Sequence, residues 1–190
     1  MPEYKFGKQT EPIDFEKFES VMENGRFVKE RKHKSFLVFL YWFGVRRSEA
    51  LERVKEDFEV KDETLIVNAP AKKHGMRPFL EAPLDLPFID LIVDQVGRTP
   101  KGERVWPFSS VTAWRIVKRV MPKHYPHFFR LNRATKFLDD PNTTIPEMRA
   151  WFGWKTTKAV DSYIGISKRY IRRQSSRLMR EVKKAKENIS

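Results

Sequence analysis

Cysteine is absent from the 190-residue sequence, which excludes disulfide bonds and thiolate metal sites. The sequence also lacks a long hydrophobic run, because its strongest apolar stretch, residues 36–43, is far shorter than the roughly 20 residues that span a bilayer. The N-terminus does not show a signal-peptide pattern, and we find no internal repeat or low-complexity linker. These absences predict a cytoplasmic protein without a membrane-spanning segment.

Positive charge is what the sequence has in excess. It carries 38 Lys and Arg against 25 Asp and Glu, a formal net charge of +13. Such a charge opposes compact folding through self-repulsion, and a polyanionic partner would offset it. Nucleic acid is the first candidate for that partner and an anionic membrane surface is the second.

The hydrophobic patterns predict a mostly α-helical fold with a small antiparallel β-sheet inserted early, an α+β class. Caps and breakers place the helix ends: Asp14 begins the first helix, Gly44 and Gly97 end two others, and Ser109 or Ser110 begins another. The expected helices cover residues 14–24, 29–43, 47–54, 88–97, 110–121, 127–138, 146–152 and 156–164. The expected strands cover residues 57–60, 64–67 and 76–82, with the tip of a hairpin at 72–75.

Three regions follow from this pattern. Residues 1–11 are expected to be irregular, residues 12–166 to form the main domain, and residues 167–190 to form a basic helix or tail. That tail carries an apolar stripe, so it either packs on a neighbouring protomer or touches nucleic acid as a solvated basic helix.

The first segment with candidate chemistry runs from Gly44 to Leu51. Arg46 follows a helix that we expect to be buried, so a turn would hold its guanidinium in place. A guanidinium is a planar fork of donors that suits phosphate oxygens. The plainer interpretation is a surface pair between Arg46 and Glu49.

The second segment contains His127 and Arg130, which lie three residues apart and face the same way on a helix. Such a pair can serve one phosphate, because the arginine neutralises charge while the histidine moves a proton. The alternative is a helix-capping His127 beside an unrelated surface arginine.

The third segment contains Trp154 and Tyr163, nine residues apart and separated by one short helix. Packing in a core is the ordinary explanation for both aromatic residues. The functional alternative makes Tyr163 a nucleophile. Its rivals are the other four tyrosines: Tyr4, Tyr41, Tyr125 and Tyr170.

In order and spacing, the three segments resemble the C-terminal catalytic domain of tyrosine recombinases, the phage integrase family. That family shows Gly-Leu-Arg-x-x-Glu-Leu, then His-x-Leu-Arg, then Gly-His or Gly-Trp, with a tyrosine nine residues on. The matching positions here are Gly44 to Leu51, His127 to Arg130, Gly153-Trp154 and Tyr163. Further agreement at residues 56–58 and 134–135 extends the resemblance over about residues 12 to 165.

The resemblance implies DNA recombination or integration, of the kind seen in mobile elements, through a 3′-phosphotyrosine intermediate. The implied reaction needs no metal, ATP or other cofactor. Arg46 and Arg130 would hold the phosphate, with Tyr163 as nucleophile. His127 would accept a proton or orient the phosphate, and Trp154 would donate its indole N–H. A general acid is expected at a hairpin tip, where Lys73 is favoured over Lys72.

Five further cations are expected to contact DNA: Arg47, Lys72, Arg133, Lys155 and Lys158. The resemblance also implies double-stranded DNA, and no membrane, as partner, with self-association into a tetramer on the DNA. A cytoplasmic, nucleoid-associated location follows from that partner. Leu131 and Trp154 depart from the commoner histidines, so proton transfer would depend more on Lys73 and His127. Only about a dozen residues precede the first expected helix, which suggests a fragment, a minimal form or a remnant.

Two alternatives share these features. A type IB topoisomerase uses the same chemistry to relax supercoils as a monomer, and a non-catalytic remnant of an integrase would bind DNA without cutting it.

Overall fold

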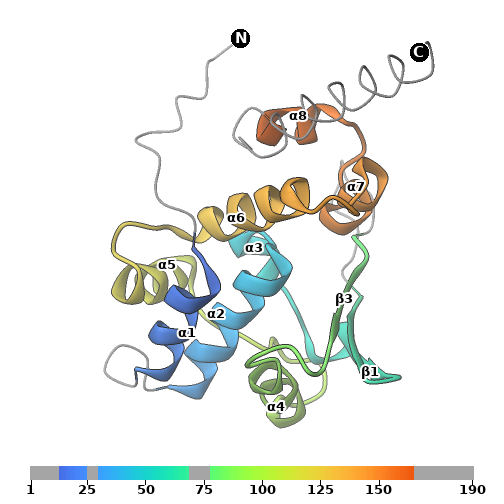
Figure 1. Cartoon of the computed structure of the whole chain (residues 1–190). Helices are drawn as coiled ribbons and strands as arrows, with labels where there is room; N and C mark the ends of the chain where they lie inside the picture. The colour runs from blue at the N-terminus through green and yellow to red at the C-terminus, as the bar shows by residue number, and fades with distance from the viewer. Residues whose placement is uncertain (1–12, 25–29, 69–77, 165–190) are drawn as a thin grey trace, which may run out of the picture. The chain divides into compact units, whose positions relative to one another are not determined.

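A computed structural model describes residues 13–24, 30–68 and 78–164, which are mostly helical with a three-stranded sheet of order β1-β2-β3 (Figure 1). The predicted α+β class is confirmed. Within these ranges, no helix has the length and apolar character needed to cross a membrane. The elements are α1 (Phe15–Glu23), α2 (Arg31–Phe43), α3 (Arg47–Leu51), the 3₁₀ turn η1 (Lys55–Asp57), β1 (Phe58–Lys61), β2 (Thr64–Val67), β3 (Leu80–Pro83), α4 (Asp90–Arg98), α5 (Ser110–Val120), α6 (Pro126–Asp139), α7 (Ile145–Phe152) and α8 (Lys158–Ile164).

The chain divides into two compact units. Unit 1 comprises Met1–Asn68 and Glu81–Asn132, and unit 2 comprises Ala69–Leu80 and Arg133–Ser190. Helix α6 therefore contributes residues to both units.

The core of unit 1 is built on α2, whose residues are buried along almost the whole second half of the helix. Helix α4 packs against it, and on α1 the ring of Phe18 stacks on Tyr41 with centroids 4.0 Å apart. Trp106 is fully buried, and its indole N–H donates to the Ser35 hydroxyl over 2.9 Å. This pairing satisfies both polar groups inside an aromatic core.

Local signals in the sequence set several element ends as predicted. The Asp14 carboxylate caps α1 by accepting from the Lys17 backbone N–H at 2.8 Å. Gly44 ends α2 in the left-handed conformation, with φ of 59°. Of the two candidate serines before α5, Ser109 is the cap, since its hydroxyl accepts from the Thr112 N–H.

Two predicted helix ends are wrong. Helix α3 ends at Leu51 instead of Val54, because the Asp57 carboxylate accepts the Val54 N–H and the Arg53 carbonyl accepts from Val105. Helix α4 continues through Gly97 to Arg98, and the Thr99 hydroxyl donates back to the Gln95 carbonyl at its end. In both cases the deciding bonds are made by side chains or by residues distant in sequence.

Strands β1 and β2 form an antiparallel hairpin that pairs Phe58 with Val67 and Lys61 with Thr64. Its turn residues Asp62 and Glu63 both have positive φ, as a tight two-residue hairpin turn requires. Of the described part of the predicted 76–82 strand, residues 78 and 79 are not in a strand, and β3 begins at Leu80 and extends to Pro83. The expected hairpin tip at 72–75 lies outside the described residues.

Unit 2 contains α7 and α8, which pack against each other. Thr144 and Glu147 form a reciprocal capping box at the start of α7, and Pro146 lies in the first turn, where a proline is tolerated. Gly153 ends α7 with φ of 64°. The chain then turns into α8, which carries Tyr163.

Candidate functional site

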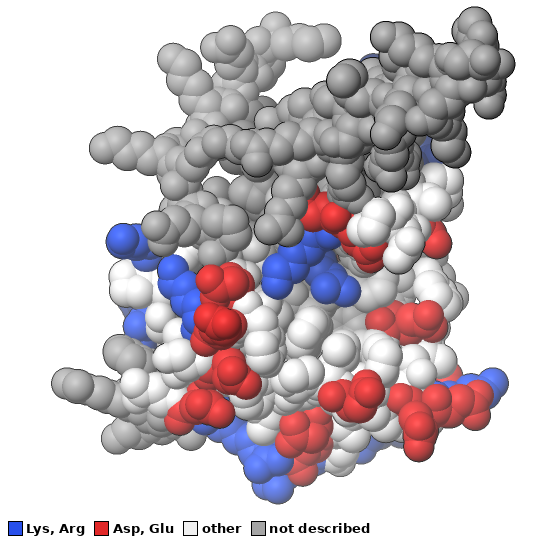
Figure 2. All heavy atoms as spheres, viewed as in Figure 1, with Lys and Arg blue, Asp and Glu red and all other residues white. Residues whose placement is uncertain are grey.

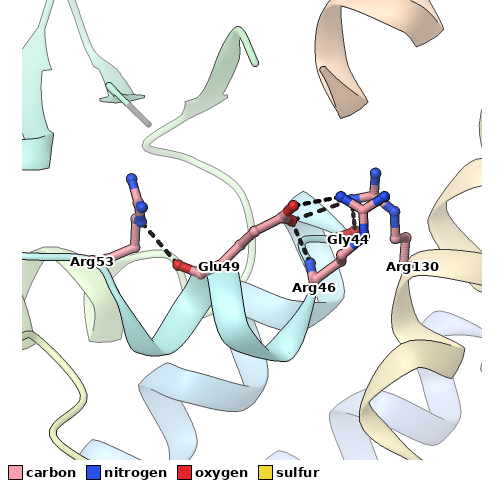
Figure 3. A network of polar contacts seen from close by, with 5 residues as sticks. All are labelled: Gly44, Arg46, Glu49, Arg53 and Arg130. Atoms are coloured by element: carbon pink, nitrogen blue, oxygen red, sulfur yellow. Dashed lines mark hydrogen bonds and ion pairs between the residues drawn. The ribbon is translucent and has the colours of Figure 1, made fainter. Parts of the chain in front are cut away.

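The centre of the site in unit 1 is a carboxylate that joins two arginines (Figure 3). Glu49 Oε1 accepts from Arg46 Nη1 at 2.6 Å, and Glu49 Oε2 lies 3.5 Å from Arg130 Nη1. Arg46 and Arg130 are 84 positions apart in the sequence, yet both guanidinium groups reach one carboxylate. The structure therefore brings together two arginines that the resemblance assigned to one phosphate.

Short elements hold these side chains in place. The Gly44 turn delivers Arg46 to the N-cap of α3, and the Arg46 backbone N–H donates to Glu49 Oε2 at 2.7 Å. The Gly44 carbonyl accepts from Arg130 Nη1 at 3.3 Å. A residue with a Cβ is strained at this left-handed turn, so glycine serves both the helix end and the arginine contact.

The two arginines differ in their exposure. The Arg46 side chain is 48% exposed and Arg130 is 2% exposed. A buried guanidinium interacts strongly with an anion because little water screens it, whereas an exposed one can change partners at low cost. Arg130 is therefore the fixed member of the pair, and Arg46 is the accessible one.

Glu49 stays ionised between the arginines. Burial on its own would raise the pKa of the carboxyl group, but the Arg130 charge and the Arg46 N–H groups outweigh it and lower the pKa below its ordinary value. The carboxylate thus offsets the repulsion between two guanidinium groups and orients both of them.

His127 is the second residue of α6 and is exposed at the surface. Partial loss of water around its ring lowers the pKa of His127, the charges of Arg130 and Arg46 lower it further, and Glu49 opposes them. The structure therefore brings His127 into the electrostatic neighbourhood of both arginines. The neutral imidazole that this favours can accept a proton.

The aromatic pair of the third segment lies in unit 2. The Trp154 ring stacks on Tyr163 with centroids 5.3 Å apart and on Phe152 with centroids 4.6 Å apart. Tyr163 is 9% exposed. The two rings are in contact, and both have the packing role that the sequence offered as the ordinary explanation.

Arg149 supports the turn that leads to this pair. Its Nε donates to the Trp154 carbonyl at 3.3 Å, and its Nη2 donates to the Lys155 carbonyl. The Trp154 backbone N–H in turn donates to the Arg149 carbonyl at 2.9 Å. Arg149 thereby fixes the backbone at Trp154 and so helps to orient the Trp154 ring.

The remaining predicted residues occupy varied environments. Lys155 and Lys158 are exposed, Arg47 is half-buried, and the Arg133 guanidinium lies 4.7 Å from the Phe137 ring centroid and 5.3 Å from that of Trp151. Lys72 and Lys73 lie outside the described residues. The packing of Arg133 over two rings gives it a structural role that the sequence did not suggest.

Among the rival tyrosines, Tyr41 is buried in the stack with Phe18, whereas Tyr125 is 38% exposed. Tyr4 and Tyr170 lie outside the described residues.

Sequence reasoning did not include Glu49 among the site residues. It appeared as a position of the matched Gly44–Leu51 pattern and as the surface partner of Arg46, and that pair does exist. The usable signal was a glutamate three residues after the arginine at the start of a short helix, where a carboxylate can cap the backbone and reach back.

Charge on the described surface is mixed. Figure 2 shows Asp and Glu side chains lying among Lys and Arg on the visible face. The described ranges contain 22 Lys and Arg and 21 Asp and Glu, so nearly all of the net charge of +13 belongs to the other residues. Within the described ranges, no group of three His, Asp or Glu side chains is placed to hold a metal ion.

Solved structures with a similar fold are site-specific recombinases and a transposon integrase. XerH bound to a palindromic difH substrate superposes with a TM-score of 0.68 at 14% identity, over 89% of this chain and 53% of XerH. XerA recombinase gives 0.66 at 13% identity, over 93% and 66%. The Tn1549 transposon integrase in complex with circular intermediate DNA gives 0.59 at 15% identity, over 83% and 63%.

The chain thus spans about half to two thirds of the length of these structures. By sequence, no family model matches the chain, and no curated protein does. The similarity is one of fold.

Proposed function

The chain has the fold of tyrosine recombinase catalytic domains, and on that premise we propose that it cleaves and rejoins DNA strands through a covalent phosphotyrosine intermediate. The observation that carries the proposal is the meeting of Arg46 and Arg130 at Glu49. Two oriented guanidinium groups match the two non-bridging oxygens of a phosphodiester.

Tyr163 is the proposed nucleophile. Its phenolic oxygen attacks the phosphorus, the bond from phosphorus to the deoxyribose 5′-oxygen breaks, and a 3′-phosphotyrosine and a free 5′-hydroxyl result. Arg46 and Arg130 stabilise the charge that develops on the phosphate oxygens, and donors of this kind are typically worth about 3–4 kcal/mol each. Attack by a 5′-hydroxyl on the phosphotyrosine reverses the step, so the phosphodiester is restored without ATP.

Two protons move in this reaction. A tyrosine hydroxyl has an ordinary pKa of about 10, so it needs an acceptor at neutral pH. We assign that role to His127, whose lowered pKa favours the neutral imidazole. The leaving 5′-oxygen needs a donor, and Lys73 is assigned to it on the sequence resemblance. Trp154 is proposed to donate its indole N–H to the phosphate.

Double-stranded DNA is the proposed substrate and partner, with self-association of protomers on it. Arg47, Lys72, Arg133, Lys155 and Lys158 are the proposed backbone contacts, and the basic region 167–190 supplies further charge. The similar structures of XerH and the Tn1549 integrase are described as complexes with DNA, which supports this choice of partner.

Covalent trapping on DNA tests the proposal. The full chain is incubated with nicked duplexes of randomised sequence, and SDS-resistant protein–DNA adducts are counted. We expect adducts with the wild type and none with Tyr163→Phe, while Tyr125→Phe, which changes an exposed tyrosine, should behave as the wild type.

An adduct that persists in Tyr163→Phe would overturn the assignment of the nucleophile. Relaxation of supercoiled plasmid without site preference would favour a type IB topoisomerase. DNA binding without any adduct on the randomised set would favour a non-catalytic remnant.

A further inference from the structure

Arg53 is a buried charged residue in unit 1 that no step of the proposed chemistry uses. Its side chain is 3% exposed. Burying a guanidinium is costly unless its donors are paired. Its placement therefore depends on the acceptors that surround it.

Those acceptors lie at both ends of the same short stretch of chain. Arg53 Nε donates to the Glu49 backbone carbonyl at 2.9 Å (Figure 3), and Nη1 lies 3.2 Å from Asp57 Oδ2. The Arg53 carbonyl accepts from the Val105 N–H at 2.9 Å, which ties this stretch to a distant part of unit 1. Arg53 is thus anchored independently of the residue that it contacts in α3.

The contact with Glu49 matters because α3 has only five residues. A helix this short has no stability of its own, so tertiary contacts set its orientation. Glu49 is held through its backbone carbonyl by Arg53 and through its carboxylate by Arg46 and Arg130. Loss of the contact with Arg53 would therefore let the Glu49 carboxylate move relative to Arg46 and Arg130.

We propose that Arg53 is a positioning residue, which fixes the end of α3 and thereby holds the Glu49 carboxylate between Arg46 and Arg130. The role suits arginine because its Nε–H donates to the Glu49 carbonyl while Nη1 of the same charged group lies 3.2 Å from Asp57 Oδ2. A lysine has a single nitrogen, so it cannot occupy both places. For its catalytic readout, the inference rests on the proposed strand cleavage.

Arg53→Lys keeps the charge and removes the Nε–H that donates to the Glu49 carbonyl. The matched control is Ser35→Ala, which removes a buried hydrogen bond to Trp106 in the same unit and leaves the network of Glu49 intact. Two quantities are measured in both variants and in the wild type: the pKa of the Glu49 carboxyl by carbon NMR titration, and the rate of adduct formation at saturating DNA.

With Arg53→Lys, we expect the Glu49 pKa to rise towards its ordinary value and cleavage to slow about 10- to 100-fold, as a displacement near 1 Å does elsewhere. DNA affinity should change far less. With Ser35→Ala, the Glu49 pKa and the cleavage rate should match the wild type. An unshifted Glu49 pKa in Arg53→Lys, or the same change in Ser35→Ala, would overturn the proposal.

Two safeguards separate the possible failures. If the wild type forms no adduct, the function proposed above fails, while the Glu49 titration still decides the role of Arg53. If Arg53→Lys does not fold, the wild type decides it: the Arg53 Nε–H resonance should exchange slowly with solvent and shift as Glu49 titrates. A rapidly exchanging resonance that is insensitive to Glu49 would contradict the positioning role.

Discussion

At the scale of single residues, Glu49 orients the side chains of Arg46 and Arg130. Replacing it by glutamine keeps the size but removes the charge between Arg46 and Arg130. Hydrogen bonds to charged groups contribute about 1.5–3 kcal/mol, so we expect Glu49→Gln to lower the free energy of unfolding by an amount in that range at pH 7. Urea denaturation measures it.

The sign of the pH dependence follows from the lowered pKa of Glu49. Its stabilising contribution is present above the ordinary value of 4.5 and is lost as the pH falls through the lower folded pKa. The difference between wild type and Glu49→Gln should therefore shrink below about pH 4.5. A difference that stays constant into that range would show that the charge of Glu49 is not what stabilises the site.

His127 gives a second prediction at this scale. Its pKa in the free protein should lie below 6.5, because the folded environment favours the neutral ring. The unfolded chain then binds more protons just below pH 6.5, so protonation opposes folding and this contribution to stability recovers as the pH rises. Proton NMR of the imidazole measures the pKa of His127, and Arg130→Met should raise that pKa. A His127 pKa above 6.5 in the wild type would contradict the arrangement.

At the scale of elements, the turn between α7 and α8 depends on Arg149. Arg149→Met removes two bonds to the carbonyls of Trp154 and Lys155 while keeping a long side chain. We expect a loss of about 1–3 kcal/mol in unfolding free energy and a slower cleavage reaction. Lys158→Met, an exposed substitution on the neighbouring helix, is the control for stability and should stay within about 0.5 kcal/mol.

Local chemistry explains which elements the sequence could predict. Asp14, Gly44 and Pro146 act on their own helix ends, so their effect is readable within a few residues. The predicted end of α3 is wrong because that end is set by the bond from the Val105 N–H to the Arg53 carbonyl. The prediction missed the continuation of α4 past Gly97 because a helix tolerates a glycine at modest cost.

The site residues divide in the same way, into those that local sequence patterns indicate and those that depend on contacts between distant parts of the chain. Order and spacing brought out Arg46, His127, Arg130, Trp154 and Tyr163. In the structure, Arg46 and Arg130 both contact Glu49, and Trp154 stacks on Tyr163. The contact from Glu49 to Arg130 spans 81 positions, and the burial of Arg53 depends on the folded neighbours of α3. Neither leaves a periodic trace in the sequence.

At the scale of the whole molecule, charge is unevenly divided along the sequence. Nine Lys and Arg lie between residues 168 and 186, while the described ranges are almost balanced. If about 6–10 phosphates are contacted, DNA affinity should fall roughly 10³–10⁵-fold between 50 and 200 mM salt. Replacing the nine cations by glutamine should make this salt dependence shallower in filter-binding titrations. An unchanged slope would show that the phosphate contacts lie outside residues 168–186.

The position of the covalent bond tests the central claim most directly. The adduct formed on nicked DNA is digested with protease and nuclease, and the nucleotide-bearing peptide is sequenced by mass spectrometry. We predict a phosphodiester between the nucleotide 3′-oxygen and Tyr163. A nucleotide attached to any other residue, or through its 5′-oxygen, would contradict the account.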